Sequence, residues 1–188
     1  QGKQDMAGFV LEQDFADPPG VAYRYSTGDS TLLLSTIDGA MRPRFGQDYP
    51  WTVLFDPLGI KDMTIEQDQA HHYVGGAYSF APPEEWARIG FFLLNDGCWN
   101  DARILPEGWV TAATTPSGPF KNKRYDDLPD EEQGRQLWLN RPIPGVRDQK
   151  PWPNVPDDAY STIGHWGQFI AVIPSRDIVI IRSGDDRD

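Results

Sequence analysis

The clearest pattern of apolar and polar positions lies near the end of the chain. Two apolar runs rich in β-branched residues, 169–173 and 178–181, flank the turn-forming residues 174–177. Runs of this kind, joined by a short Pro/Ser/Asp segment, predict an antiparallel hairpin. The segment 164–168 directly before them reads Gly-His-Trp-Gly-Gln. Glycines on both sides of two large rings indicate a strand that another group approaches closely.

Helical spacing dominates the first half of the chain. Leu32 to Leu34 and Ile37 predict a buried helix that begins at an N-cap among Ser26, Thr27 and Asp29 and ends at Gly39. The clearest helix covers 82–94, with prolines and acidic residues in its first turn and an apolar stripe. Weaker signals predict short helices within 6–16, 51–55 and 104–110.

Turn-forming residues fill most of the rest. The segment 116–158 is dense in proline, glycine and charge, and within it only 136–140 predicts a strand. The parts 126–133 and 145–158 are expected to be surface loop. A connection of this length often frames a binding site. Helices in the first half and strands towards the end predict an α+β fold.

Composition excludes several kinds of protein. With 188 residues and 39% apolar side chains, the chain is long enough for one domain with a real core. A net charge of −11 argues against nucleic acid and against an anionic membrane surface. The single cysteine, Cys98, can form neither an internal disulfide nor a cysteine metal cluster. No apolar run reaches the ~18 residues of a membrane span. The first residues carry no signal-peptide pattern and no starting Met, and they resemble the interior of a protein.

Most of the candidate chemistry has an ordinary explanation. His71 and His72 are adjacent and have no further His or Cys at ligand spacing, so we expect a solvated loop, no metal and no cofactor. The acidic runs 126–127, 130–132 and 185–186 are expected to be solvated surface. Phosphate-binding loops, dinucleotide fingerprints and Gly-x-Ser-x-Gly elbows are absent from the sequence. Tyr25 and His165, each taken alone, are typical of half-buried structural residues.

Five segments, taken in order, change this interpretation. They are Tyr25-Ser26-Thr27, the run Leu-Phe-Asp-Pro-Leu-Gly-Ile at 54–60, Glu-Trp-Ala-Arg-Ile-Gly at 85–90, the matching positions 96–97, 104–106 and 109–110, and 164–168. Over roughly 18–184 the chain resembles the serine β-lactamase and penicillin-binding-protein family. The resemblance is strongest to the class C β-lactamase-related branch, which includes esterases and 6-aminohexanoate-dimer-hydrolase-like amidases.

The resemblance implies a β-lactamase/transpeptidase-like fold, in which an antiparallel sheet is flanked by helices and a helical subdomain. It divides the chain into a mainly helical part at 18–115 with the Tyr element, sheet strands at 134–184, and a loop-rich 116–158. It also favours a periplasmic or secreted protein. It leaves the oligomeric state open.

The same resemblance implies roles for individual residues. Tyr25 would be the catalytic tyrosine, and because a free tyrosine has a pKa of about 10, it would need a neighbouring cation near neutral pH. Thr27 stands where the family often has Asn and would contact substrate. Tyr25 would lie across the cleft from the strand that carries 164–168.

On that strand, His165, Trp166 and Gly167 would replace Lys-Thr-Gly and bind substrate, with Gly167 leaving room for it. The backbone N–H of Gln168 would form half of the oxyanion hole, a donor that typically contributes about 3–4 kcal/mol. Loss of the Lys favours an ester, amide or peptide substrate over a β-lactam.

The family nucleophile lies in Ser-x-x-Lys, and none of the eight serines here has Lys three residues later. The sequence therefore predicts the C-terminal part of a serine hydrolase that acts through an acyl-enzyme, with its N-terminal part missing and the fragment itself inactive. A cut sheet would also leave an unpaired edge and an exposed apolar face. Two alternatives remain: a non-catalytic module that binds peptides or cell-wall fragments, and a globular domain that retains the motifs without the function.

Overall fold

The computed structural model describes residues 4–19, 25–117, 132–142 and 148–187. Contacts within the chain group the described residues into two units, one up to Pro82 and one from Pro83 onwards. The predicted division of the chain into a helical part at 18–115, a loop-rich part at 116–158 and sheet strands at 134–184 stays a prediction.

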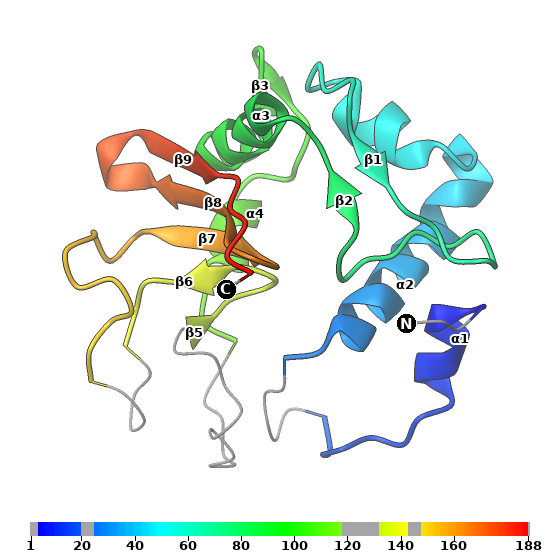
Figure 1. The fold of residues 1–188 in the computed structure, drawn as a ribbon. Helices are drawn as coiled ribbons and strands as arrows, with labels where there is room; N and C mark the ends of the chain where they lie inside the picture. Colours follow the sequence, from blue (N-terminus) through cyan, green and yellow to red (C-terminus); the bar gives the residue numbers. More distant parts are fainter. Residues whose placement is uncertain (1–3, 20–24, 118–131, 143–147, 188) are drawn as a thin grey trace. The chain divides into compact units, whose positions relative to one another are not determined.

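The first unit is mainly helical (Figure 1). Its elements are α1 (Met6–Leu11), α2 (Thr27–Phe45), the π-helical turn η1 (Trp51–Phe55), and the antiparallel pair β1 (Thr64–Ile65) and β2 (Ser79–Phe80). α1 packs against α2. Leu58 and Ile60, which follow η1, are fully buried and form the centre of this unit.

Two predictions about α2 are wrong. The helix does not end at Gly39 but continues to Phe45 and ends before Gly46, whose φ of 81° is left-handed. An ion pair of 2.6 Å between Arg42 and Asp38 spans the turn beyond Gly39 and supports the longer helix. The helix is also not buried along its apolar residues: among its described residues only Thr31 and Asp38 are buried. Consecutive leucines spread around a helix at 100° per residue, so they cannot share one buried face.

The second unit combines two helices with a sheet. α3 (Pro83–Leu94) leads into the two-stranded hairpin of β3 (Cys98–Trp99) and β4 (Ala102–Arg103), then into α4 (Trp109–Ala113). Five antiparallel strands follow in the order β5 (Glu132–Gln133), β6 (Trp138–Leu139), β7 (Tyr160–Gly164), β8 (Gln168–Ile173) and β9 (Ile178–Arg182). This confirms the α+β prediction, the helix at 82–94 and the final hairpin.

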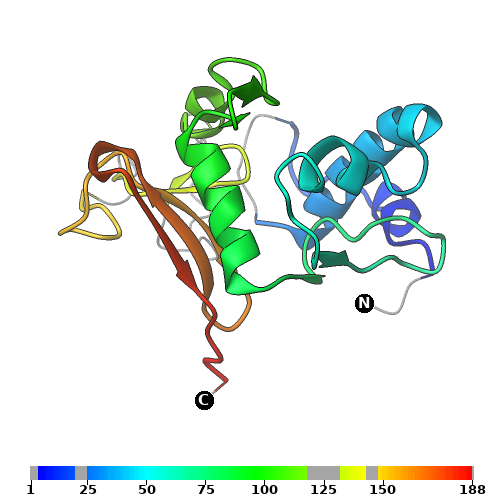
Figure 2. The same cartoon turned by 90° about the horizontal axis from the view of Figure 1, so that it is seen from above.

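α3 covers one face of this sheet (Figure 2). The register pairs Ile170 with Ile181 and Val172 with Val179, so these four side chains share the face toward α3. They join a core that also contains other buried side chains of the unit (Ala113, Leu137, Leu139, Tyr160). On the other face of the outer strand β9, Ile178 and Ile180 are 41% and 50% exposed, as expected for an apolar face without a covering layer.

A buried amide orders the loop that precedes β7. Asn140 is fully buried, and its side chain accepts the N–H of Trp152 at 2.8 Å. Its amide donates to the carbonyls of Trp152, Val155 and Pro156 at 3.0–3.1 Å. The described part of the predicted surface loop at 145–158 is therefore anchored to the end of β6 by one side chain.

No helix among the residues described here is both long enough and apolar enough to cross a membrane.

Gly90 provides the close contact between α3 and the sheet, and its substitution tests that packing. A Cβ at Gly90 would overlap Val179 Cγ1 and lie 3.0 Å from Ile170 Cγ2. We expect Gly90→Ala to lower the free energy of unfolding by about 1–3 kcal/mol, although alanine is the better helix former. Gly39→Ala is the matched control, because a Cβ there meets nothing within 4 Å. We expect it to raise stability by about 0.5–1 kcal/mol. Urea titrations followed by circular dichroism measure both, and an unchanged or stabilised Gly90→Ala would contradict this description of the interface.

Candidate functional site

The segment 164–168 forms the hairpin turn between β7 and β8. Gly164 is the last residue of β7 and pairs with Gln168, the first residue of β8. His165, Trp166 and Gly167 lie in the turn, so the prediction that they occupy a strand is wrong. The physical reason is the left-handed backbone of two successive residues, with φ of 57° at Trp166 and 82° at Gly167, which reverses the chain.

A left-handed conformation is costly for a bulky residue such as Trp166, and several contacts hold it. Its carbonyl accepts the N–H of Asp186 at 3.2 Å. The centre of its ring lies 4.5 Å from the centre of the His165 ring. The guanidinium carbon of Arg187 lies 4.8 Å from the same ring centre. Cation–π contact of this kind favours one ring position even at the surface. Trp166 is still 46% exposed, so the contacts leave a large part of the residue accessible to solvent.

Arg182 holds the next residue of the turn. Its Nη1 donates to the carbonyl of Gly167 at 2.7 Å and to Asp186 Oδ2 at 2.8 Å, and its Nη2 donates to Asp186 Oδ1 at 2.7 Å. The Arg182 hydrogen bond and charge hold the pKa of Asp186 below its ordinary 3.8, and Asp186 raises the pKa of Arg182. We call Arg182 and Asp186 the turn clamp. Because one guanidinium binds a carboxylate and a backbone carbonyl together, the clamp ties 184–187 to the turn.

Gln168 lies beside the clamp. Its side-chain Nε2 donates to the carbonyl of Gly184 at 2.5 Å, a second link between β8 and the C-terminal segment. A Cβ on Gly167 would run into both Arg182 Nη1 and Asp186 Oδ2. Gly167 is therefore required by the clamp as well as by its left-handed backbone. Whether the backbone N–H of Gln168 serves an oxyanion stays a prediction.

Tyr25 and Thr27 lie at the start of α2 in the first unit. Ser26 between them is the N-cap, and its Oγ accepts the N–H of Asp29 at 3.1 Å. The side chain of Tyr25 is 56% exposed, and Thr27 is exposed in the first helical turn. Gly76 lies so close to Thr27 that a side chain there would overlap it. The structure thus brings Tyr25 and Thr27 together, and separately His165 to Gln168. The facing arrangement of Tyr25 and the turn stays a prediction.

Sequence reasoning missed the turn clamp. The prediction that 185–186 is solvated surface is confirmed, since both side chains are 58% exposed, but it did not foresee that Asp186 binds Arg182 and that Asp185 pairs with Arg187. The spacing of an Arg and an Asp four residues apart after a strand was visible. This spacing did not predict an ion pair, because a four-residue spacing brings side chains together in a helix and neither residue is helical. The segment 165–167, which Arg182 contacts, was also expected to be a strand and not a turn.

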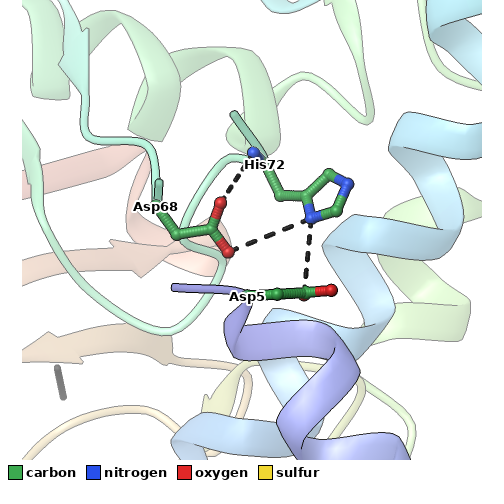
Figure 3. A group of neighbouring side chains, drawn as sticks. All are labelled: Asp5, Asp68 and His72. Atoms are coloured by element: carbon green, nitrogen blue, oxygen red, sulfur yellow. Dashed lines mark hydrogen bonds and ion pairs between the residues drawn. The ribbon is translucent and has the colours of Figure 1, made fainter. Parts of the chain in front are cut away.

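A separate group of potential metal ligands also lies in the first unit. Asp5, Asp68 and His72 each offer one ligand atom, and these atoms all lie within 4.8 Å of one another (Figure 3). The prediction that His72 has no partner ligands considered only His and Cys nearby in sequence. The structure places two carboxylates beside His72, and one of them, Asp5, lies 67 positions earlier in the sequence.

Comparisons of the fold with solved structures give close matches, whereas no family profile and no curated protein sequence matches the chain. A protein assigned as a 6-aminohexanoate-dimer hydrolase from Bacillus anthracis superimposes with a TM-score of 0.67 at 20% identity, over 96% of this chain and 42% of its own. A β-lactamase from Mycobacterium bovis gives 0.64 at 16% identity, over 90% of this chain and 59% of its own. Simvastatin synthase from Aspergillus terreus gives 0.64 at 15% identity, over 92% of this chain and 51% of its own.

These likenesses establish the fold as that of the β-lactamase/transpeptidase-like proteins, which confirms the predicted architecture. The chain spans about half the length of the solved structures it resembles.

The turn clamp predicts how firmly 164–168 is held. Asp186→Asn removes the charge that Arg182 binds, and Arg182→Lys removes the planar fork that reaches Asp186 and Gly167 together. We expect each to speed amide hydrogen exchange in 164–168 about twofold or more at neutral pH. Asp157→Asn, which breaks an exposed ion pair with Lys150, is the matched control and should leave that exchange unchanged.

The effect of Asp186→Asn has a defined pH dependence. Because the pKa of Asp186 is lowered in the folded chain, its contribution is fully present above pH 3.8 and is lost as pH falls through the lower folded value. Exchange rates of wild type and variant, compared at each pH, should therefore converge below pH 3.8. A difference that persists undiminished there would show that the carboxylate charge does not hold the turn.

Proposed function

We propose that the protein containing this chain is a serine hydrolase that cleaves an ester or amide through an acyl-enzyme. The observation that carries the proposal is a fold shared with β-lactamase-like hydrolases, in which the hairpin of β7 and β8 presents Gly-His-Trp-Gly-Gln on a restrained turn. Fold alone hosts many functions, so the proposal depends on this turn and on the Tyr25 element at the start of α2.

The turn suits oxyanion stabilisation in physical terms. A backbone N–H stabilises a developing negative charge best when it need not reorganise during the reaction. Gln168 follows two left-handed residues whose carbonyls are both held: that of Trp166 accepts the N–H of Asp186, and that of Gly167 accepts Arg182 Nη1. We assign its N–H as one oxyanion donor. Gly167 leaves the approach to that N–H free of a side chain, and His165 and Trp166 would line the substrate site.

Tyr25 is assigned to proton transfer. It is exposed at the N-terminus of a helix, where the first unpaired N–H groups carry a partial positive charge. In this role Tyr25 would accept a proton from a serine, assisted by a cation from the rest of the protein. Thr27, two residues later and exposed, would contact the substrate.

The nucleophile has to come from outside this chain. None of its serines precedes a lysine by three residues, and Ser161, the serine nearest the turn in sequence, is 1% exposed within β7. We therefore expect 1–188 alone to be inactive. Absence of the fixed lysine of Lys-Thr-Gly at 165–167 favours esters and amides over β-lactams, whose carboxylate needs a cation.

The decisive variant is Tyr25→Phe in the full-length protein, assayed with a short-chain p-nitrophenyl ester. We expect kcat/KM to fall about a hundredfold or more, the range for loss of a general acid–base group. Tyr78→Phe in the same unit is the control and should retain activity. Full activity of Tyr25→Phe would remove the role assigned to that residue.

Two further outcomes test the class of function. Hydrolysis by the isolated chain at an ordinary rate would contradict an external nucleophile. A full-length protein that contains no Ser-x-x-Lys and hydrolyses neither the ester nor a matching anilide would instead be a non-catalytic binding module.

A further inference from the structure

A second potential site lies in the first unit, between the start of α1 and the loop joining β1 to β2. Asp5 precedes α1, and Asp68 and His72 belong to the loop. His72 Nδ1 lies 3.7 Å from Asp5 Oδ1 and 3.9 Å from Asp68 Oδ2. Figure 3 shows the imidazole turned with this nitrogen toward both carboxylates. Residues 63 and 67 positions apart in sequence thus meet at one point.

Asp68 is rigidly held. Its side chain is 1% exposed, and its oxygens accept N–H groups from Met6 at 2.9 Å, Ala70 at 3.0 Å and His72 at 2.9 Å. Asp5 is fixed as the N-cap of α1 through the N–H of Gly8 at 2.7 Å. Backbone donors of this kind orient carboxylates in the way that second-sphere groups orient metal ligands.

His72 Nδ1 is the independent sign of a missing partner. The atom is buried and has no hydrogen-bond partner, and both oxygens that it faces are too distant for an N–H···O bond. A buried polar atom without a partner is costly. Because this nitrogen faces two carboxylate oxygens, a cation between the three atoms would give each of them a partner. Within the described residues, no Lys or Arg is paired with Asp5 or Asp68.

The spacing suits a metal ion. One ion can lie about 2.0–2.5 Å from all three atoms, which is the range of Zn–N and Zn–O bonds or slightly beyond it. One imidazole nitrogen and two carboxylate oxygens suit Zn²⁺ and Mn²⁺, whereas Ca²⁺ and Mg²⁺ prefer oxygen alone. We propose that Asp5, Asp68 and His72 bind a divalent transition-metal ion that cross-links the start of α1 to the loop between β1 and β2.

This site is independent of the proposed hydrolase function, and the proposed role of the ion is structural. Among the described residues, two hydrogen bonds join these segments: the N–H of Met6 donates to Asp68 Oδ2, and the N–H of Ala70 donates to the carbonyl of Gln4. Metal binding adds a bond to each segment in the folded state alone, so it should stabilise the attachment of α1.

Calorimetric titration of the metal-free protein with Zn²⁺ and with Mn²⁺, with Mg²⁺ as comparison, tests the proposal. We expect one equivalent of Zn²⁺ or Mn²⁺ to bind, and saturating metal to raise the melting temperature by about 2 °C or more. Hydrogen exchange in 6–11 should slow on binding. Mg²⁺ should produce neither effect.

Two variants remove ligands in different ways. His72→Ala deletes the nitrogen, and Asp5→Asn keeps the helix cap while removing the charge. Each should weaken binding about tenfold or more, without loss of the folded circular dichroism spectrum. His71→Asn is the matched control, because His71 is exposed with φ of 64°, which Asn tolerates. It should bind as wild type does.

Three results would overturn the proposal. They are absence of binding at micromolar metal, equal weakening by His71→Asn, and stoichiometric binding that survives both ligand variants.

Discussion

The close packing of α3 on the sheet is the constraint on which the second unit depends. Gly90 lets the helix approach Val179 and Ile170 without an intervening Cβ, so β8 and β9 are held against the same helix face. The register between β8 and β9 then determines which residues pair at the ends of these strands. With Ile170 opposite Ile181, Phe169 must pair with Arg182, and the guanidinium comes beside the turn that precedes β8. The turn clamp is a consequence of register as much as of charge.

Strongly patterned elements could be predicted from sequence. The hairpin of β8 and β9 followed from β-branched runs around Pro174, and α3 from its prolines, acidic first turn and single apolar stripe. Local signals failed where two explanations competed. Gly39 looked like a helix end, but a glycine inside a helix costs only about 1 kcal/mol, and the Asp38–Arg42 pair lies across it. At 164–168, the glycines were assigned to a close approach on a strand, whereas Gly167 supplies a left-handed turn.

The least predictable features are those that join distant segments. Nothing near His72 in sequence points to Asp5, because their meeting depends on how α1 folds back onto the loop after β1. Asp186 lies four residues from Arg182, yet its significance depends on the turn that both residues enclose. Motif order, by contrast, carried the fold family correctly although identity to the matched structures is 20% or lower.

Asn140 has an implication for the way the second unit opens. Its amide group serves three carbonyls and an N–H of 152–156 from the end of β6. Releasing any part of that loop leaves the buried Asn140 amide and several backbone groups without hydrogen-bond partners. Partial opening of the loop therefore costs nearly as much free energy as complete opening. The loop and the end of the strand should therefore behave as one cooperative unfolding unit. A molecule that binds the loop surface would act on the end of β6 through Asn140, and on the turn between β8 and β9 through Asp158, which accepts the N–H and the hydroxyl of Ser175.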